Sequence, residues 1–161
     1  MQRGVSGQAT VEFSLVIGLV LLMILGAVQV GLYAIERNNA MSATEEGVLT
    51  AVSAESSAAG PPASSSAVYA AIAPQLDTAL FGARSVHQDP VQGTCPALDP
   101  AWPVGEVRVC SEYDAALGTV EVSVRGWLPA LVPPSFGIGG ARAWALPLDI
   151  HEVAHVATFA P

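Results

Sequence analysis

Residues 13–35 read FSLVIGLVLLMILGAVQVGLYAI, a run with neither a charged residue nor a proline. A helix rises about 1.5 Å per residue, so about 20 residues cross the roughly 30 Å hydrocarbon core of a bilayer. The run is long enough to do so, and it predicts a transmembrane helix.

A buried core helix and a cleaved secretory signal also contain apolar runs. A core helix usually keeps a polar stripe, and residues 13–35 show none that is wide enough. A secretory signal has an apolar stretch of about 7–15 residues before its cleavage site, whereas this run is longer and continues helix-like. We therefore expect a retained single-pass anchor. Arg3 precedes it and the acid-rich bulk follows it, which favours a cytoplasmic N-terminus and an extracytoplasmic C-terminal domain.

The composition of the whole chain limits its partners. The 161 residues include 14 acids and 6 basic residues, all of them arginine, for a net charge of −8. Binding to phosphate backbones needs clustered Lys and Arg, and these arginines are scattered, so we expect no nucleic-acid partner. The hydrophobic share of 52% argues against general disorder.

The helix is expected to continue beyond the membrane over residues 36–55, which contain no proline and are rich in helix formers. Glu45 and Glu46 are interpreted as a solvated face. A Gly/Pro/Ser-rich linker then ends the rod, and a second short helix is expected over 68–80, interrupted at Pro74. The side chains expected to pack on the exported domain or on a neighbouring subunit share helical spacing: Met41, Val48, Leu49 and Val52.

The C-terminal half changes to short β-rich runs. Residues 107–110 and 120–125 alternate apolar and polar side chains, as strands with one buried face do, and they predict an antiparallel pair. One or two more strands are expected over 141–146 and 153–159, with Pro147 at an edge or a break. The expected fold class is α+β: a long hydrophobic transmembrane helix that continues into an exported domain with a short helix and a small antiparallel β-sheet.

Cys95 and Cys110 allow one disulfide or none. An exported domain lies in an oxidising compartment, which favours the disulfide, and closing a loop of this size contributes roughly 3 kcal/mol in the chain-entropy model. In a domain that stayed inside the cell, both residues would be free thiols.

The string His151-Glu152-Val153-Ala154-His155 matches the HExxH pattern of zinc metalloproteases. That chemistry needs a helix, so that both histidines meet the zinc from one face, and a third ligand, normally further along the chain. No residue after His155 supplies one, and the surrounding run alternates like a strand, which would set the two histidines about 13 Å apart. We interpret the match as chance and expect no metal, no cofactor and no enzymatic activity.

Glu12 directly precedes the apolar run. By itself it is an interfacial acid, favoured there by the macrodipole at a helix N-terminus. The residues around Glu12 indicate a more specific role. Gly7 precedes it, and Phe13 and a long apolar helix follow it. This order resembles the processing site of type IV pilin-like proteins, in which a peptidase cuts after the glycine.

The resemblance narrows to one family, the TadE-like proteins, which are pilin-like components of tight adherence pili. Residues 7–16, GQATVEFSLV, look like the start of these proteins, and residues 43–47, ATEEG, are similar to their alanine-rich segment. The similarity covers about residues 4–52. The chain departs from the family pattern at Gly18, where a proline is frequent, and at Gln29, where an acid is frequent.

The resemblance implies cleavage between Gly7 and Gln8, so that Gln8 carries the new N-terminal ammonium. In this class the ammonium of one subunit lies near the carboxylate, here Glu12, of another, and such a pair is tolerated in low dielectric where a lone carboxylate is not. Glu12 and Phe13 would set the assembly register, and residues 13–35 would form the packing surface. The implied partners are a prepilin peptidase, other pilin-like subunits, an inner-membrane pilus assembly platform and the membrane.

The expected organisation is a cleaved leader (1–7), a long helix (8–55) with the span 13–35, a linker (56–67) and an exported α+β domain (68–161). The leading hypothesis is a TadE-like minor pilin or pseudopilin in tight adherence pilus assembly and surface adhesion. Two alternatives stay open. One is a single-span anchored exported binding domain that is not assembled into a pilus, and the other is a membrane-tethered zinc hydrolase.

Overall fold

The computed structural model describes residues 5–55, 65–80, 85–89, 95–114, 116–130 and 145–156. Within these ranges, helices and strands alternate little along the chain, because both helices precede the sheet. The α+β class expected from the sequence is confirmed. The elements in chain order are α1 (Val5–Glu55), α2 (Ser65–Ala79), β1 (Ser85–Gln88), β2 (Glu106–Asp114), β3 (Thr119–Pro129) and β4 (Ala145–His155).

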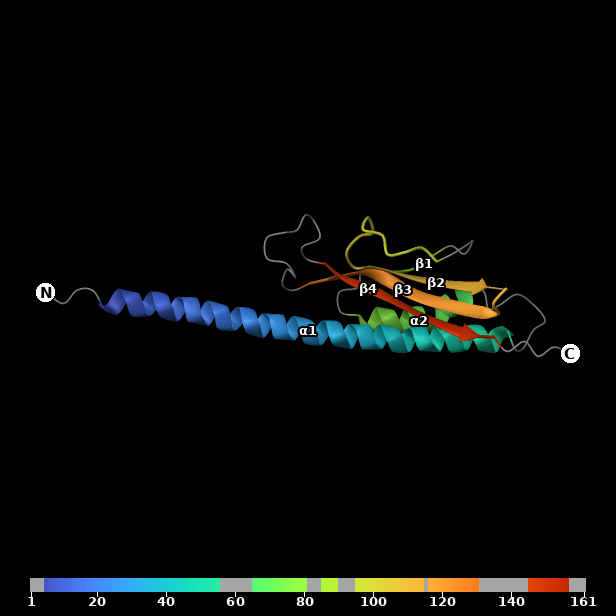
Figure 1. The fold of residues 1–161 in the computed structure, drawn as a ribbon, viewed down its shortest axis with the longest axis horizontal. Helices are drawn as coiled ribbons and strands as arrows, with labels where there is room; N and C mark the ends of the chain where they lie inside the picture. Colours follow the sequence, from blue (N-terminus) through green and yellow to red (C-terminus); the bar gives the residue numbers. More distant parts are fainter. Residues whose placement is uncertain are drawn as a thin grey trace.

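Helix α1 is one uninterrupted rod of 51 residues, about 75 Å long at 1.5 Å per residue. Its N-terminal half projects away from the domain, while its C-terminal half lies against it (Figure 1). The expectation that the apolar run and residues 36–55 form a single helix is confirmed. The span and the support of the domain are therefore parts of one rigid element.

The four strands form one sheet in the order β1-β2-β3-β4. Strands β2, β3 and β4 are antiparallel, whereas β1 pairs parallel to β2, so the expected antiparallel sheet is in fact mixed. Strand β1 was not predicted, because its four residues, SVHQ, show no apolar alternation.

A single strand, β4, replaces the two strands expected around Pro147. Strand β4 forms one edge of the sheet, and Pro147 lies opposite Trp127 of β3. A proline at an edge removes no ladder hydrogen bond when its nitrogen faces away from the neighbouring strand, so the strand passes through it. The other parts of the two expected strands, residues 141–144 and 157–159, lie outside the described residues.

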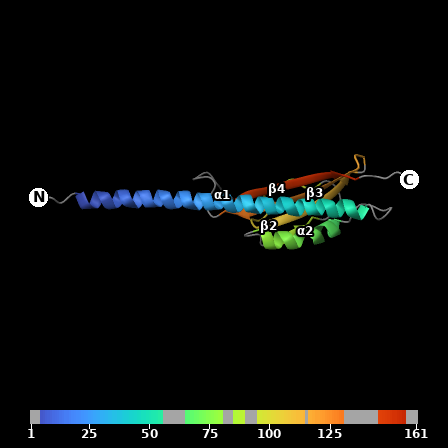
Figure 2. The ribbon, with the colours of Figure 1, turned by 90° about the horizontal axis from the view of Figure 1, so that it is seen from below.

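Both helices cover the same face of the sheet, with α1 and α2 side by side (Figure 2). The period-2 pattern of the strands directs alternate side chains of β3 into this layer, where Val120, Val122, Val124 and Leu128 are buried. The core is completed by Val107 and Val109 of β2, Leu148 and Ile150 of β4, Val68, Ile72 and Leu76 of α2, and Ala40, Ala43, Val48 and Ala51 of α1.

The packing face of α1 includes three of the four side chains expected on it. Val48 is buried, and Met41 and Val52 are partly buried, but Leu49 is 69% exposed. Small residues form the buried stripe instead: Ala40, Ala43, Thr44, Gly47 and Ala51. Small side chains let the helix axis approach the sheet closely, and their low hydropathy hides such a stripe from a search for large apolar residues.

Helix α2 also departs from expectation. Residues 65–67, expected in the linker, form its first turn, and the helix runs through Pro74 without ending. Pro74 removes one backbone hydrogen bond, but Ile72 and Leu76 on either side of it are fully buried, and their packing offsets that loss. The rest of the expected linker, residues 56–64, lies outside the described residues.

Gly47 marks the closest approach of α1 to the rest of the core. A Cβ at this position would overlap Ile72 Cδ1 and lie 2.9 Å from Ile72 Cγ1 and 3.3 Å from Val122 Cγ1. Because Ile72 is fully buried, it has no free space to move into. We expect Gly47→Ala to lower the free energy of unfolding by about 1–2 kcal/mol, since overpacking outweighs the gain in helix propensity. Thermal unfolding of the full chain in detergent, followed by tryptophan fluorescence, measures this.

The matched control is Gly31→Ala on the same helix, where a Cβ would meet nothing within 4 Å and no loss of stability is expected. Adding Ile72→Val to Gly47→Ala removes the methyl group that clashes, so the double variant should lose less than the sum of the two single changes. Strict additivity would contradict the proposed clash.

Candidate functional site: the apolar half of helix α1

The N-terminal half of α1 exposes large apolar side chains around its whole circumference. From Val11 to Val30, those identified as exposed leave between 40% and 70% of their area uncovered. A membrane-span test on the described residues selects one helix, Ala9–Ser53, whose most apolar window has a mean hydropathy of 2.6 and is 0% buried. A core helix is mostly buried, so this segment is instead an N-terminal apolar helix suited to single-pass membrane anchoring.

The residues predicted for processing and assembly lie together at the free end of this helix. Gly7 and Gln8 belong to the first turns of α1, and Glu12 and Phe13 follow about one turn later. The side chains of Glu12 and Phe13 are exposed, Phe13 by 66%. The free end therefore presents a carboxylate beside a bare aromatic ring, next to the bond predicted for cleavage.

Glu12 is the acidic residue at the start of the apolar run. Ser14 Oγ donates to the carbonyl of Thr10 at 2.8 Å, so this hydroxyl is satisfied within its own helix. Between Glu12 and Glu36 the sequence contains no other charged residue. Glu12 is thus the one charge that an apolar environment would have to accommodate along this stretch, and such an environment requires a counter-charge.

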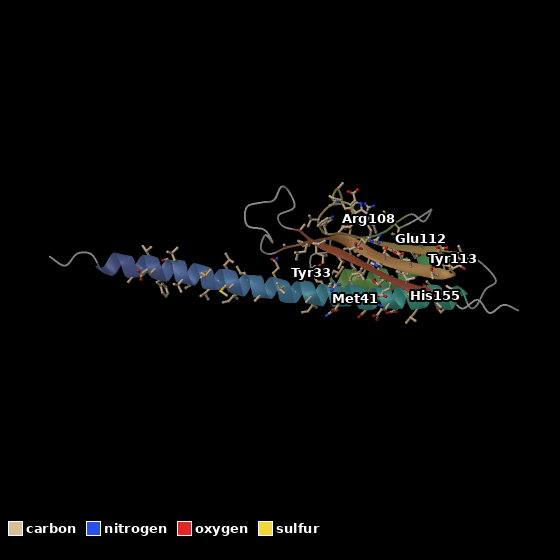
Figure 3. The ribbon with its side chains drawn as sticks, in the orientation of Figure 1. Tyr33, Met41, Arg108, Glu112, Tyr113 and His155 are labelled. Atoms are coloured by element: carbon tan, nitrogen blue, oxygen red, sulfur yellow. A yellow bond between two sulfur atoms is a disulfide. The ribbon has the colours of Figure 1, made fainter. Side chains whose placement is uncertain are left out.

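The opposite end of the apolar run meets the domain at Tyr33. The hydroxyl of Tyr33 donates to the carbonyl of Pro147 at 2.6 Å, and Glu36, about one turn further on, is buried. Figure 3 shows Tyr33 where the helix first comes under the domain, and Met41 further along the contact. No local sequence pattern marks Tyr33 as a contact residue, because its partner lies 114 residues away.

On the sheet face away from the helices, a disulfide joins Cys95 to Cys110 of β2, with their Cα atoms 5.8 Å apart. The described part of the connection between β1 and β2, residues 95–105, is also held by side chains of β3. Arg125 Nη1 donates to the carbonyl of Cys95 at 3.3 Å, and Trp127 Nε1 donates to the carbonyl of Asp99 at 2.9 Å. These groups fasten one loop across the sheet, so their role is structural.

Arg108 completes the same surface (Figure 3). Its guanidinium lies 4.4 Å from the ring centroid of Trp102 and contacts Asp89 at 3.2 Å and Glu106 at 2.7 Å. Burial lowers the pKa of Arg108, but its hydrogen bonds and charge interactions with Glu106 and Asp89 outweigh this and raise the pKa above its ordinary value. The period-2 pattern of β2 could have placed Arg108 on this face, but no local pattern indicates its partners.

The HExxH string lies in a strand, as the alternation predicted. His151 and His155 are exposed residues of β4, opposite Ser123 and Thr119 of β3. His87 lies on β1, at the other edge of the sheet. In the part of the chain that the structure describes, no three His, Cys, Asp or Glu side chains are grouped as a metal site would need. The metalloprotease motif requires both histidines on one face of a helix, and here they lie on a strand.

A single exposed apolar helix that continues beneath a small α+β domain defines a class of protein: one anchored in a membrane by its N-terminal helix. A comparison with known families refines this class. The family model described as TadE-like protein matches residues 7–49, so this segment is similar to TadE-like proteins, as the sequence resemblance indicated. It begins at Gly7, includes Glu12 and the apolar run, and extends past Gly47, while α2 and the sheet lie outside it. No curated protein and no solved structure matches the chain significantly.

The disulfide offers a direct test of how the outer loop contributes to stability. Replacing both cysteines, Cys95→Ser with Cys110→Ser, should lower the free energy of unfolding by roughly 3 kcal/mol, because the unfolded chain is no longer constrained by the closed loop. Thermal unfolding of the full chain in detergent measures the loss. A reductant should lower the stability of the native chain to that of the double variant and leave the variant unchanged. Equal stability of native chain and variant would contradict the prediction.

Proposed function

We propose that this protein is a TadE-like minor pilin or pseudopilin, which takes part in tight adherence (type IV-like) pilus assembly and surface adhesion after cleavage by a prepilin peptidase. The TadE-like match suggests a pilus-associated, pilin-like protein. The observation that carries the finer proposal is the free end of α1, where Gly7, Glu12 and Phe13 precede an apolar helix left bare on all sides.

The proposed mechanism depends on two opposite charges at the N-terminal end of α1. Cleavage between Gly7 and Gln8 would create an ammonium group close to an otherwise uncharged helix surface. When apolar helices pack together, a Glu12 carboxylate without a counter-charge would oppose packing, whereas an ammonium from a neighbouring subunit would neutralise it. Only one axial stagger of the two helices brings these groups together, so the pair would set the register.

The proposal places the protein in the cell membrane with a cytoplasmic N-terminus and an extracytoplasmic domain, from which it enters a surface pilus. The disulfide between Cys95 and Cys110 supports this orientation, since disulfides persist in oxidising compartments. The partners would be the prepilin peptidase, other pilin-like subunits and the inner-membrane assembly platform. We propose that the protein acts by binding and assembly, without catalysis or cofactor, and that its sizeable domain suits a minor subunit.

Cleavage is the first step to test. The intact mass of the membrane-extracted protein should correspond to loss of residues 1–7 when a prepilin peptidase is co-produced, and to the full chain when it is not. A full-length mass under both conditions would contradict the processing step and favour the single-span anchored binding domain. Stoichiometric zinc in the same sample would favour the membrane-tethered hydrolase.

Assembly is tested by Glu12→Gln, which removes the charge and keeps the shape. We expect this variant to be inserted and cleaved normally but to be absent from sheared pili, because the register pair is lost while the helix stays apolar. Immunoblots of the membrane and pilus fractions measure both steps. Glu45→Gln, at an exposed position of the same helix, is the matched control and should assemble normally. Normal incorporation of Glu12→Gln would refute the role of Glu12.

A further inference from the structure

The domain overlaps the last turns of the apolar run with no spacer between them. Along α1, Gln29 and Leu32 are half-buried, Tyr33 is hydrogen-bonded to the domain, and Glu36 is buried. These positions recur at helical spacing, so they form one stripe that faces the domain. The domain thus begins to cover α1 before the apolar run ends.

The length of the helix fixes where this overlap lies relative to a bilayer. From Phe13 to Tyr33 the helix rises about 30 Å, which is the thickness of the hydrocarbon core. With Glu12 at one border of the core, Tyr33 lies at the other, at the depth where tyrosine is enriched in membrane proteins. A domain bonded to Tyr33 is therefore at the level of the lipid headgroups.

The bond from Tyr33 is made to a backbone group that the sheet leaves free. Trp127, opposite Pro147 in the register, has its carbonyl bonded to the amide of Gly105 of the preceding loop at 2.6 Å. The backbone of Trp127 thus faces β2, and the carbonyl of Pro147 correspondingly faces the outer edge of β4. Tyr33 occupies this edge position and ties the start of β4 to the helix.

The two ends of the sheet differ in charge. Among the described residues, those of β3 and β4 nearest Tyr33, 126–130 and 145–148, carry no charge, and Pro129 and Pro147 are exposed. The closest carboxylates on neighbouring positions of the sheet are paired, Glu106 with Arg108 and Asp149 with Arg125. Toward the other end of the sheet, across the roughly 33 Å length of β3, acidic side chains gather on β2, β3 and β4: Glu112, Asp114, Glu121 and Glu152. An uncharged end is suited to a headgroup layer, and an acidic end is suited to water.

We propose that the strand ends at residues 128–130 and 145–148 rest on the lipid headgroups of the membrane that holds α1, and that the hydrogen bond from Tyr33 to Pro147 keeps them there. This inference rests on the membrane-anchoring part of the proposed function but not on cleavage or pilus assembly. In this state the domain stands directly on the bilayer, with the acidic hairpin between β2 and β3 pointing away from it.

The test uses the full chain in phosphatidylcholine vesicles, without peptidase or other subunits. A fluorophore is attached at Pro129→Cys, with the native disulfide left intact, and lipids that carry a nitroxide on the headgroup serve as quenchers. We expect strong loss of fluorescence at position 129. The matched control is Leu117→Cys, whose side chain is 69% exposed at the opposite end of β3, and it should lose little. Equal and weak quenching at both positions would overturn the proposal.

Two further variants separate the possible reasons for failure. A fluorophore at Leu22→Cys, in the middle of the apolar run, should be quenched by lipids with the nitroxide on the acyl chain. No quenching there would overturn membrane anchoring itself, whereas quenching at 22 without quenching at 129 would overturn only the resting position of the domain. Because the vesicles contain no assembly partners, neither result depends on the pilus proposal.

The hydrogen bond is tested by Tyr33→Phe, which keeps the ring and removes the donor. We expect it to reduce quenching at position 129, because the domain is released from the helix at this point. Tyr69→Phe is the matched control, since Tyr69 also donates to a backbone carbonyl, that of Val86 at 2.9 Å, but inside the domain. Undiminished quenching in Tyr33→Phe would refute the positioning role of this bond.

Discussion

The close contact between the small residues of α1 and the core of the domain is the constraint on which the rest of the structure depends. Ala40, Ala43 and Gly47 bring the helix backbone close enough for Ile72 and Val122 to fill the layer beneath the sheet. Larger side chains would push the helix outward and open voids that the core does not tolerate. This contact holds the domain on its anchor, and the hydrogen bond from Tyr33 to Pro147 adds a second attachment at the end nearest the apolar run.

The two halves of α1 therefore suit two different environments. Its first half is apolar on every side and suits lipid or neighbouring helices, whereas its second half is apolar only in a narrow stripe and suits the sheet. The TadE-like match spans both halves, from Gly7 to residue 49, and includes the stripe up to Gly47. The shared segment is thus more than a membrane anchor, since it also carries much of the surface that receives the domain.

The sequence predicted those features that a regular period encodes. Residues 13–35 predicted the helix, and the alternation in residues 107–110 and 120–125 predicted β2 and β3. Leu49, expected to pack on the domain or on a neighbouring subunit, does not pack on the domain, because hydropathy favours large side chains where close packing selects small ones. Strand β1 and the bond from Tyr33 to Pro147 depend on partners distant in sequence, which no local pattern records. Among the candidate site residues, Glu12 and Phe13 lie in α1, but their proposed role in assembly depends on other subunits and stays a prediction.

The continuity of α1 has a mechanical consequence. No proline interrupts the helix between Val5 and Glu55, so a pull on its free end is transmitted along its axis without bending at a hinge. The force then acts as shear along the stripe from Ala40 to Ala51, where the contacts share the load and must slip together. The disulfide on the far face of the sheet lies outside this path, so tension along the helix is resisted by packing rather than by a covalent crosslink.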